Sequence, residues 1–387
     1  MKLKARYILI VIVIAQFFCT SLWFAGNAIM PDLINILGLK AEDLGWVTSS
    51  VQLGFIAGTL VYTFWTIPDR FKATRVFLIS AFLGAIVNAI SIWAAGWETL
   101  LISRFFTGFF LAGIYPVGMK IAADHFENRL GKSLGYLVGA LVLGTALPHL
   151  LASFEVALDW KRVIGGTSSL AMLGGLMLFL FVPEKSKQAL KTKARFSESW
   201  SAFSGKEFRA AAFGYFGHMW ELYAFWAFVP MMLQLYSAYH LTEIQTSFWS
   251  FIIIGGGSLS CVIGGWLSGW FGEEKVARIA LATSGSCCLL APLSFTFSKA
   301  FFLFFLNVWG LAVIADSPLF SSLVARSAVP ALKGTALTLV TCIGFSITIF
   351  SIQLLTFLAS HFEPKYGFLA LAIGPALGLV YSRKKTE

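Results

Sequence analysis

Long apolar runs separated by short polar segments make up most of the chain. Each run is long enough to cross a membrane core of about 30 Å as a helix that rises about 1.5 Å per residue. The runs are predicted at 7–30, 44–66, 75–95, 98–121, 132–153, 163–182, 208–235, 243–268, 276–298, 300–325, 333–359 and 366–382. The pattern predicts an all-α membrane protein with about twelve transmembrane helices.

The composition agrees with this pattern. Hydrophobic residues make up 58% of the chain and charged residues 12%, whereas soluble domains carry about 25% charged residues. The net charge of +10 comes from lysines and arginines in short loops. Because these residues do not form the basic face of a folded domain, nucleic acid is not an expected partner.

The distribution of lysine and arginine predicts the orientation. Segments on the side of the N-terminus hold 23 of the 29 basic residues, the opposite segments hold 5, and Arg104 falls inside an apolar run. Basic loops remain in the cytoplasm. We therefore expect a multi-pass protein of the bacterial inner membrane with both termini in the cytoplasm.

The five cysteines all lie within apolar runs, and none shows the spacing of a metal site or lies in an outer loop where a disulfide would form. No metal and no cofactor is expected.

One long polar stretch, 183–207, lies almost at the midpoint of the chain and is basic. It predicts a cytoplasmic linker between an N-terminal half at 1–182 and a C-terminal half at 208–387. The two halves also look like repeats, because Gly108 and Pro116 recur at the same spacing as Gly310 and Pro318. Parallel six-helix repeats are a transporter architecture with the substrate site near the membrane midplane.

The loops after the second and eighth runs carry a degenerate repeat. The first reads Trp65-Thr-Ile-Pro-Asp69-Arg70-Phe71-Lys72-Ala-Thr-Arg75, and the second begins at Gly265 and keeps Gly272. Together they resemble the G-x-x-x-D-R/K-x-G-x-x-R/K loop of the major facilitator superfamily, although Trp65 and Lys72 replace its glycines in the first copy. Arg104, followed by Gly108 and Gly113, resembles the helix-four signature of the same family. The resemblance covers essentially the whole chain and implies two pseudo-symmetric six-helix halves and secondary transport by alternating access.

The resemblance also implies a cytoplasmic gate. Its residues are Asp69, Arg70, Arg75, Gly265, Gly272 and, at the start of the eleventh helix, Gly334. The alternative is that the charged members only set the topology. The fifth run (Gly135, Gly139, Gly144, Pro148) only loosely resembles the family's antiporter motif and lacks Gly-Pro-x-x-Gly-Gly, so the direction of transport stays open.

Glu221 is the first candidate for membrane chemistry. It lies about 12 residues into the seventh run, about 18 Å deep. A charge at the bilayer centre costs roughly 2.5–3.5 kcal/mol on insertion scales, so such a residue suggests function. Carboxyl groups removed from water can exchange protons near neutral pH. His218, three residues earlier, could relay that proton; the alternative is a structural pair between helices.

Asp316 and Arg104 are the next candidates. Asp316 precedes Pro318, which frees backbone groups of the tenth helix. We predict a second proton-coupling acid there, or an acid that only caps the break. Arg104 keeps its charge and needs a carboxylate, carbonyl groups or an anionic ligand. The resemblance implies substrate binding or proton transfer, and the alternative is a side chain that extends to the interface.

Further polar and aromatic residues could line a substrate cavity. They are Trp23, Asn27, Gln52, Tyr115, Trp220, Tyr223 and Trp226. For each, ordinary helix packing is the competing interpretation.

These observations favour a proton-coupled carrier of a small organic anion or amphipathic organic compound. We expect a monomer that binds protons and substrate in the bilayer. A proton-driven drug or metabolite efflux antiporter is the close alternative. Alternatives of other classes are a transporter-like sensor and an intramembrane enzyme with His218 and Glu221 as an acid–base pair. There is no Walker A sequence, so ATP hydrolysis by this chain is not expected.

Overall fold

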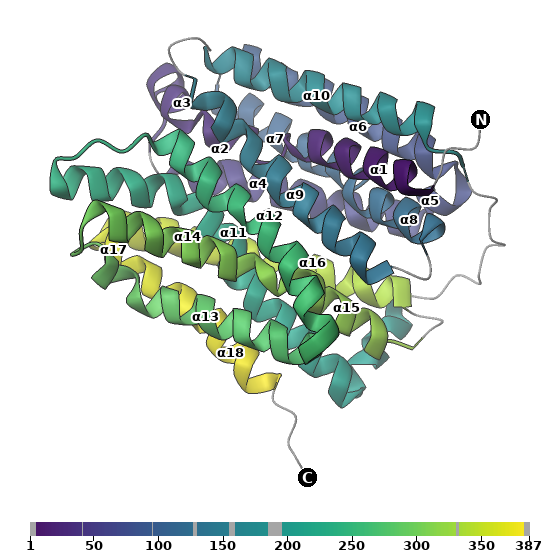
Figure 1. Cartoon of the computed structure of the whole chain (residues 1–387). Coiled ribbons are helices and arrows are strands. Elements are labelled where there is room, and N and C mark those ends of the chain that lie inside the picture. The colour runs from purple at the N-terminus through teal and green to yellow at the C-terminus, as the bar shows by residue number, and fades with distance from the viewer. Residues whose placement is uncertain are drawn as a thin grey trace. The chain divides into compact units, whose positions relative to one another are not determined.

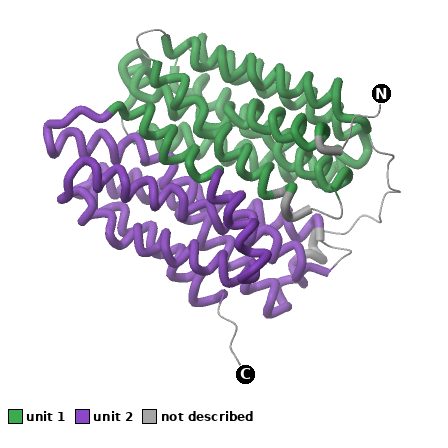
Figure 2. Tube along the Cα trace, in the orientation of Figure 1, with its two compact units in different colours: residues 1–190, 245–258 green, residues 191–244, 259–387 purple. Residues whose placement is uncertain are grey.

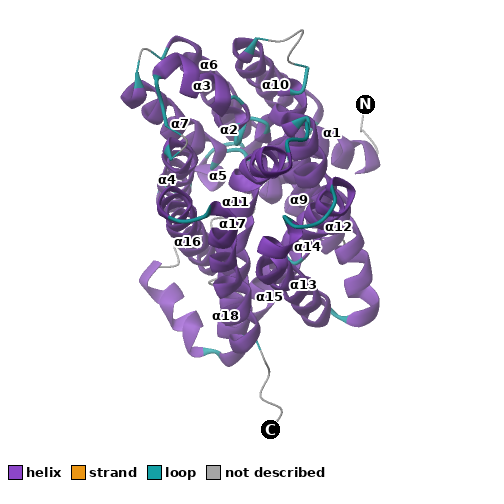
Figure 3. Ribbon diagram, turned by 90° about the vertical axis from the view of Figure 1, so that its left-hand side faces the viewer, coloured by secondary structure: helices purple, strands orange, loops and turns teal. Residues whose placement is uncertain are grey.

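The computed structural model describes residues 5–40, 42–94, 96–126, 130–154, 159–184, 196–329 and 333–382. All regular elements in these ranges are α-helices or short 3-10 helices (Figure 3). The predicted linker falls largely outside them, because only its ends, up to residue 184 and from residue 196, are described. The prediction of an all-helical membrane protein is confirmed.

The helices of the first half are coloured in chain order from purple through blue to teal in Figure 1. They are α1 (Ala5–Thr20), α2 (Ala25–Ala28), α3 (Met30–Leu37), α4 (Asp43–Phe64), α5 (Ile67–Arg70), α6 (Ala73–Ile90), the 3-10 helix η1 (Ser91–Trp93), α7 (Trp97–Leu111), α8 (Tyr115–His125), α9 (Leu130–Ala152) and α10 (Trp160–Phe181).

The second half begins with the 3-10 helix η3 (Phe196–Ser204) and the 35-residue α11 (Lys206–His240). It continues with α12 (Thr246–Phe271), α13 (Glu273–Ser294), α14 (Lys299–Ala315), α15 (Ser317–Ser327), α16 (Lys333–His361), α17 (Pro364–Gly367), η5 (Phe368–Ala372) and α18 (Ile373–Tyr381).

Nine helical segments among the described residues are long and apolar enough to cross a membrane. They are Asp43–Phe64, Ala73–Trp93, Trp97–His125, Gly135–Ala152, Trp160–Phe181, Thr246–Phe271, Glu273–Ser294, Lys299–Ser327 and Gly334–His361. The predicted runs 7–30, 208–235 and 366–382 are not among them. The first of these contains the shorter apolar helix Tyr7–Thr20, and the last forms α17, η5 and α18.

Three predicted continuous helices are broken in the structure. The run 7–30 ends as α1 at Thr20, turns, and resumes in α2 and α3, the latter with a proline in its first turn. The runs 98–121 and 300–325 break before Pro116 and Pro318, which each lie in the first turn of the next helix. Proline has no N–H to donate and its ring clashes with the preceding turn, so each break follows from the local sequence.

The chain forms two compact units (Figure 2). Unit 1 comprises Met1–Leu190 and Gln245–Ser258, and unit 2 comprises Lys191–Ile244 and Leu259–Glu387. The first part of α12 belongs to unit 1 because it packs on α9: the position of a Cβ on Gly255 would lie 3.3 Å from Ala146. The Gln245 amide also donates to the Ser153 carbonyl oxygen at 3.1 Å.

Close helix packing in each unit depends on glycine. In unit 1, a Cβ at Gly54 would lie 1.8 Å from the Phe105 carbonyl oxygen, and one at Gly108 would lie 2.0 Å from that of Val51, so α4 and α7 approach backbone to backbone. In unit 2, a Cβ at Gly217 of α11 would lie 2.4 Å from the Gly374 carbonyl oxygen of α18, and one at Gly374 would lie 2.5 Å from that of Gly217. Small residues permit such contacts between membrane helices.

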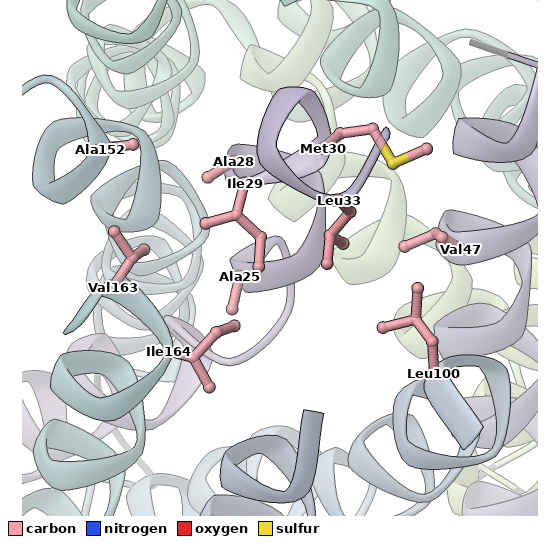
Figure 4. Packing of buried hydrophobic residues seen from close by; sticks show 10 residues of the cluster. All are labelled: Ala25, Ala28, Ile29, Met30, Leu33, Val47, Leu100, Ala152, Val163 and Ile164. Atoms are coloured by element: carbon pink, nitrogen blue, oxygen red, sulfur yellow. The ribbon is translucent and has the colours of Figure 1, made fainter. Parts of the chain in front are cut away.

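The short helices α2 and α3 are held by an apolar cluster within unit 1 (Figure 4). The segment from α2 to α3 contributes Ala25, Ala28, Ile29, Met30 and Leu33. These side chains pack against Val47, Leu100, Ala152, Val163 and Ile164 of α4, α7, α9 and α10. The cluster fixes the position of the interrupted helix, and with it the backbone that Arg104 contacts.

Candidate functional site

Glu221 lies in the middle of α11 and is 1% exposed. Its Oε1 accepts a hydrogen bond from the Trp309 indole N–H of α14 at 2.6 Å, and its Oε2 accepts one from the Ser284 hydroxyl of α13 at 2.8 Å. Three helices of unit 2 therefore meet at one carboxyl group. The sequence offered no signal for Trp309 or Ser284, because an indole or a hydroxyl in an apolar run is ordinary.

His218 lies one turn before Glu221 but pairs with a different acid. Its Nδ1 lies 2.7 Å from Asp316 Oδ1, and both side chains are fully buried. Asp316 stands at the junction of α14 and α15, where its backbone carbonyl accepts from the amides of Leu319 and Phe320. The structure thus brings together His218 and Asp316, which are 98 positions apart in the sequence.

The two acidic sites are neighbours. Glu221 and His218, the contact of Asp316, lie one turn apart on α11. Neither His218 Nε2 nor Asp316 Oδ2 has a hydrogen-bond partner among the described residues. Unit 2 therefore contains two buried carboxyl groups and one imidazole within a small volume, with hydrogen-bonding capacity still unused.

Arg104 is fully buried in unit 1. Its Nη1 donates to Asn88 Oδ1 at 2.7 Å, and its Nη2 donates to the carbonyl oxygens of Leu22 and Trp23 at 2.8 and 2.9 Å. Both carbonyls lie in the turn between α1, which ends at Thr20, and α2, which begins at Ala25. No ion pair with an acid is formed by Arg104 within the described ranges.

Asn88 of α6 is a residue that sequence reasoning missed. Since arginine can only donate, Asn88 Oδ1 must face Arg104, and Nδ2 donates to Ser168 Oγ at 2.9 Å, Thr167 Oγ1 at 3.2 Å and the Ile164 carbonyl at 3.3 Å. One side chain therefore ties α6 and α10 to Arg104. Its neutral type hid it among the packing residues of the third run.

The predicted cavity residues divide between the units. In unit 1, Asn27 Nδ2 donates to Thr48 Oγ1 at 2.7 Å, and the ring of Trp23 lies 4.9 Å from that of Phe55. Gln52 is fully buried, and neither amide atom has a hydrogen-bond partner among the described residues. Tyr115 is the first residue of α8.

In unit 2, Tyr223 and Trp226 are buried and their rings lie 5.3 Å apart. Trp220 instead donates its indole N–H to the carbonyl of Ala370 in η5 at 3.0 Å. Its polar atom is thus used by packing within the unit.

The predicted gate residues lie at the ends of the helices. Asp69 Oδ1 is 3.4 Å from Lys120 Nζ of α8, and Lys120 also contacts Asp124 at 3.3 Å. Arg70 ends α5 and Arg75 lies in the first turn of α6. The α6 N-terminus is capped by Glu184, whose carboxylate accepts from the amide of Ala73 at 2.9 Å.

The gate glycines of unit 2 differ in role. Gly265 and Gly272 border open space, as does Gly334 in the first turn of α16. Gly272 has φ of 84° and forms the one-residue turn between α12 and α13. A residue with a Cβ would be strained there, which explains the glycine.

Comparison with known proteins places this geometry in a family. The family model described as Major Facilitator Superfamily matches residues 12–352. The uncharacterized transporter YgaY of Escherichia coli O157:H7 is 24% identical over 235 residues, which cover 57% of this chain and 58% of that protein. The chain therefore matches little more than half the length of this curated relative.

Solved structures match over the full length. A bacterial homolog of the human lysosomal transporter Spinster, in an inward-facing and unoccupied conformation, has a TM-score of 0.74 at 14% identity, covering 99% of this chain and 98% of that chain. The human organic anion transporter MFSD10 has a TM-score of 0.74 at 16% identity, covering 99% and 100%. The chain belongs to the Major Facilitator Superfamily of membrane transporters and is not an enzyme.

Proposed function

We propose that this protein is a secondary transporter that couples a small organic anion or amphipathic organic compound to protons by alternating access. The observation that carries the proposal is the Glu221 carboxyl group, 1% exposed and held by donors from two other helices. A carboxyl group buried inside a membrane protein is costly, so its presence suggests a function. We place the protein in the bacterial inner membrane with cytoplasmic termini, acting as a monomer.

The hydroxyl of Ser284 supports reversible protonation of Glu221. Ser284 Oγ lies 2.8 Å from Glu221 Oε2 and 3.2 Å from the Leu281 carbonyl oxygen. While Glu221 is charged, the hydroxyl donates to it. When Glu221 takes a proton, its own O–H donates to Ser284 Oγ, and the serine hydroxyl turns to Leu281. No buried group loses its partner in either state, so the exchange avoids the cost of an unsatisfied polar atom.

The His218–Asp316 pair provides a second proton site in this proposal. An imidazole and a carboxyl group 2.7 Å apart can share one proton. His218 also lies one turn before Glu221 on α11, so the proposed second site stands next to the first.

Arg104 supports an anionic group on the substrate. Its contacts are an amide and two backbone carbonyls, all neutral, so its positive charge remains available to an anion. The unpaired amide of Gln52 and the unpaired Oδ1 of Asn27 in the same unit can hydrogen-bond a polar substrate. Trp23 and Tyr115, with Trp220, Tyr223 and Trp226 of unit 2, are proposed to contact its apolar part.

The helix ends are proposed to gate the cytoplasmic side. The contact between Asp69 and Lys120 holds the loop that carries Arg70 and Arg75 against α8. Gly265, Gly272 and Gly334 leave room at the corresponding ends in unit 2. We propose that these elements change contacts as the carrier alternates between its two states.

The test is proton movement in proteoliposomes with a pH-sensitive dye inside and a panel of organic anions and drugs added outside. Wild type is expected to move protons with at least one compound, and Glu221→Gln is expected to lose that signal. Glu207→Gln is the matched control, because Glu207 lies exposed in the first turn of the same helix. The direction of proton flow distinguishes uptake from efflux.

If Glu221→Gln moves protons as well as wild type, Glu221 is not the coupling residue. If wild type binds a compound, detected by thermal stabilisation, but moves neither compound nor protons, the sensor alternative is favoured instead. Transport of a compound without protons would leave a carrier that is not proton-coupled.

A further inference from the structure

We propose that the α12–α13 end of unit 2 binds the headgroup of an anionic glycerophospholipid. The surface, named here the hairpin surface, consists of Trp266, Trp270, Phe271, Lys275 and Arg278. It is independent of the proton-coupling site and of the transported substrate.

The position of the hairpin surface follows from the chain path. Helices α12 and α13 both qualify as membrane spans, and Gly272 alone connects them. A hairpin with a one-residue turn brings the last turn of α12 and the first turn of α13 to the boundary between hydrocarbon and water. Tryptophan and lysine at this depth meet the headgroup region of the bilayer.

The aromatic part of the surface is open. Trp266 is 61% exposed, Trp270 65% and Phe271 56%. The two indole rings lie 4.3 Å apart, and Gly265 and Gly269 beside them border open space. Neither indole N–H has a hydrogen-bond partner among the described residues. Two indole N–H donors without partners among the described residues therefore lie beside two glycines, Gly265 and Gly269, where no side chain covers the helix backbone.

The cations of the surface are also unpaired. Lys275 Nζ lies 5.8 Å from the centre of the Phe271 ring and has no ion pair within the described ranges. Arg278, one turn later, has none either, and its Nε is buried without a hydrogen-bond partner. Two acids, Glu273 and Glu274, precede these cations on α13. The Glu273 carboxylate binds Arg326 at 2.9 Å, and neither acid forms an ion pair with Lys275 or Arg278 within the described ranges.

An apolar strip leads away from these groups along α12. Leu259, Val262 and Ile263 are 64%, 39% and 51% exposed. The strip and the aromatic residues of the hairpin surface together cover residues 259 to 271 of α12, about 18 Å of helix. Two cations and two N–H donors at one end and an apolar face along the helix match the phosphate and the acyl chains of one phospholipid. The free positive charges select an anionic headgroup over a zwitterionic one.

The experiment uses the full-length protein in phosphatidylcholine vesicles that contain either brominated phosphatidylglycerol or brominated phosphatidylcholine at equal mole fraction. Bromine quenches nearby tryptophan. The chain has 13 tryptophans, so the emission of the two surface indoles is taken as the difference between wild type and Trp266→Phe/Trp270→Phe. A cation near an anionic surface contributes about 1 kcal/mol, or about a fivefold preference. The difference signal should therefore be quenched at a severalfold lower content of the anionic lipid.

Two further variants decide the matter. Lys275→Gln/Arg278→Gln, prepared in both tryptophan backgrounds, should reduce the preference to about one, while the charge-conserving Lys275→Arg/Arg278→Lys should retain it. Lys161→Gln is the control, because Lys161 lies over the Trp160 ring at 5.7 Å, outside the hairpin surface, and should leave the preference intact. Equal quenching by both lipids in wild type, or a preference that survives loss of both charges, would mean that the surface is a general interfacial anchor and would overturn the proposal.

Discussion

Asn88→Ala tests whether the stability of unit 1 depends on the neutral Asn88 side chain that holds the buried Arg104 cation. The substitution removes the 2.7 Å acceptor of Arg104 Nη1 and the donors to Ile164, Thr167 and Ser168. A hydrogen bond to a charged group contributes about 1.5–3 kcal/mol, and a buried donor that loses its partner retains its desolvation cost.

The other lost bonds contribute less to the expected effect. Thr167 Oγ1 also lies 3.0 Å from the Val163 and Ile164 carbonyl oxygens and can keep those acceptors. Arg104 is fully buried, so no water replaces the Asn88 acceptor that its Nη1 loses. The net loss is therefore about 2–4 kcal/mol, at the large end for a single substitution.

All five cysteines are free and buried, so a thiol-reactive fluorescent dye reports unfolding on heating. For a unit of this size, about 1 kcal/mol shifts the midpoint by roughly 2–4 °C. Asn88→Ala is expected to lower the apparent midpoint by about 4–16 °C. Asn307→Ala is the matched control, because Asn307 Nδ2 only donates to the Leu303 carbonyl one turn back, and it should shift the midpoint by less than about 2 °C.

A companion variant separates stability from transport. Asn88→Asp restores an acceptor for Arg104 and adds a negative charge beside it, so much of the stability should return. Transport of an anionic compound should nevertheless fall, because the cation is then neutralised. If Asn88→Ala unfolds within 1 °C of Asn307→Ala, by the same size scaling, the assigned role of Asn88 is wrong.

Three further predictions concern packing, the proton site and a helix cap. Gly108→Ala should fail to fold or lose most of its stability, since its Cβ would lie 2.0 Å from a backbone oxygen of α4, whereas Gly165→Ala, with open space around it, should behave as wild type in the same dye assay. Trp309→Phe removes the 2.6 Å donor that stabilises charged Glu221, so the proton should be held more tightly and the pH profile of transport should move to higher pH; an unchanged profile would contradict this. Glu184→Ala removes the cap of α6 and should cost about 1 kcal/mol in the thermal assay, with no change in the pH profile.

The sequence by itself determined the class of the protein. Apolar runs of membrane-spanning length, basic loops on one side and two degenerate loop motifs all report on local chemistry, which the linear order of residues displays. It also singled out Glu221, Asp316 and Arg104, because an ionisable group in an apolar run is conspicuous on energetic grounds.

The breaks in the helices were only partly visible. Pro116 and Pro318 indicate where two runs are interrupted, since proline lacks the N–H of a helix interior. The break after Thr20 carries no such mark at its start. It depends on the apolar cluster around α2 and α3 and on Arg104, which binds the carbonyls of Leu22 and Trp23.

Only the tertiary structure decided the partners of the buried charges. Trp309 is 88 positions from Glu221, and Ser284 is 63. The one-turn spacing of His218 and Glu221 suggested a pair, yet His218 contacts Asp316. A helix presents neighbouring side chains to different helices, so spacing fixes which residues share a face and not what lies opposite. Burial makes each partner matter, because a membrane interior supplies no water to replace it.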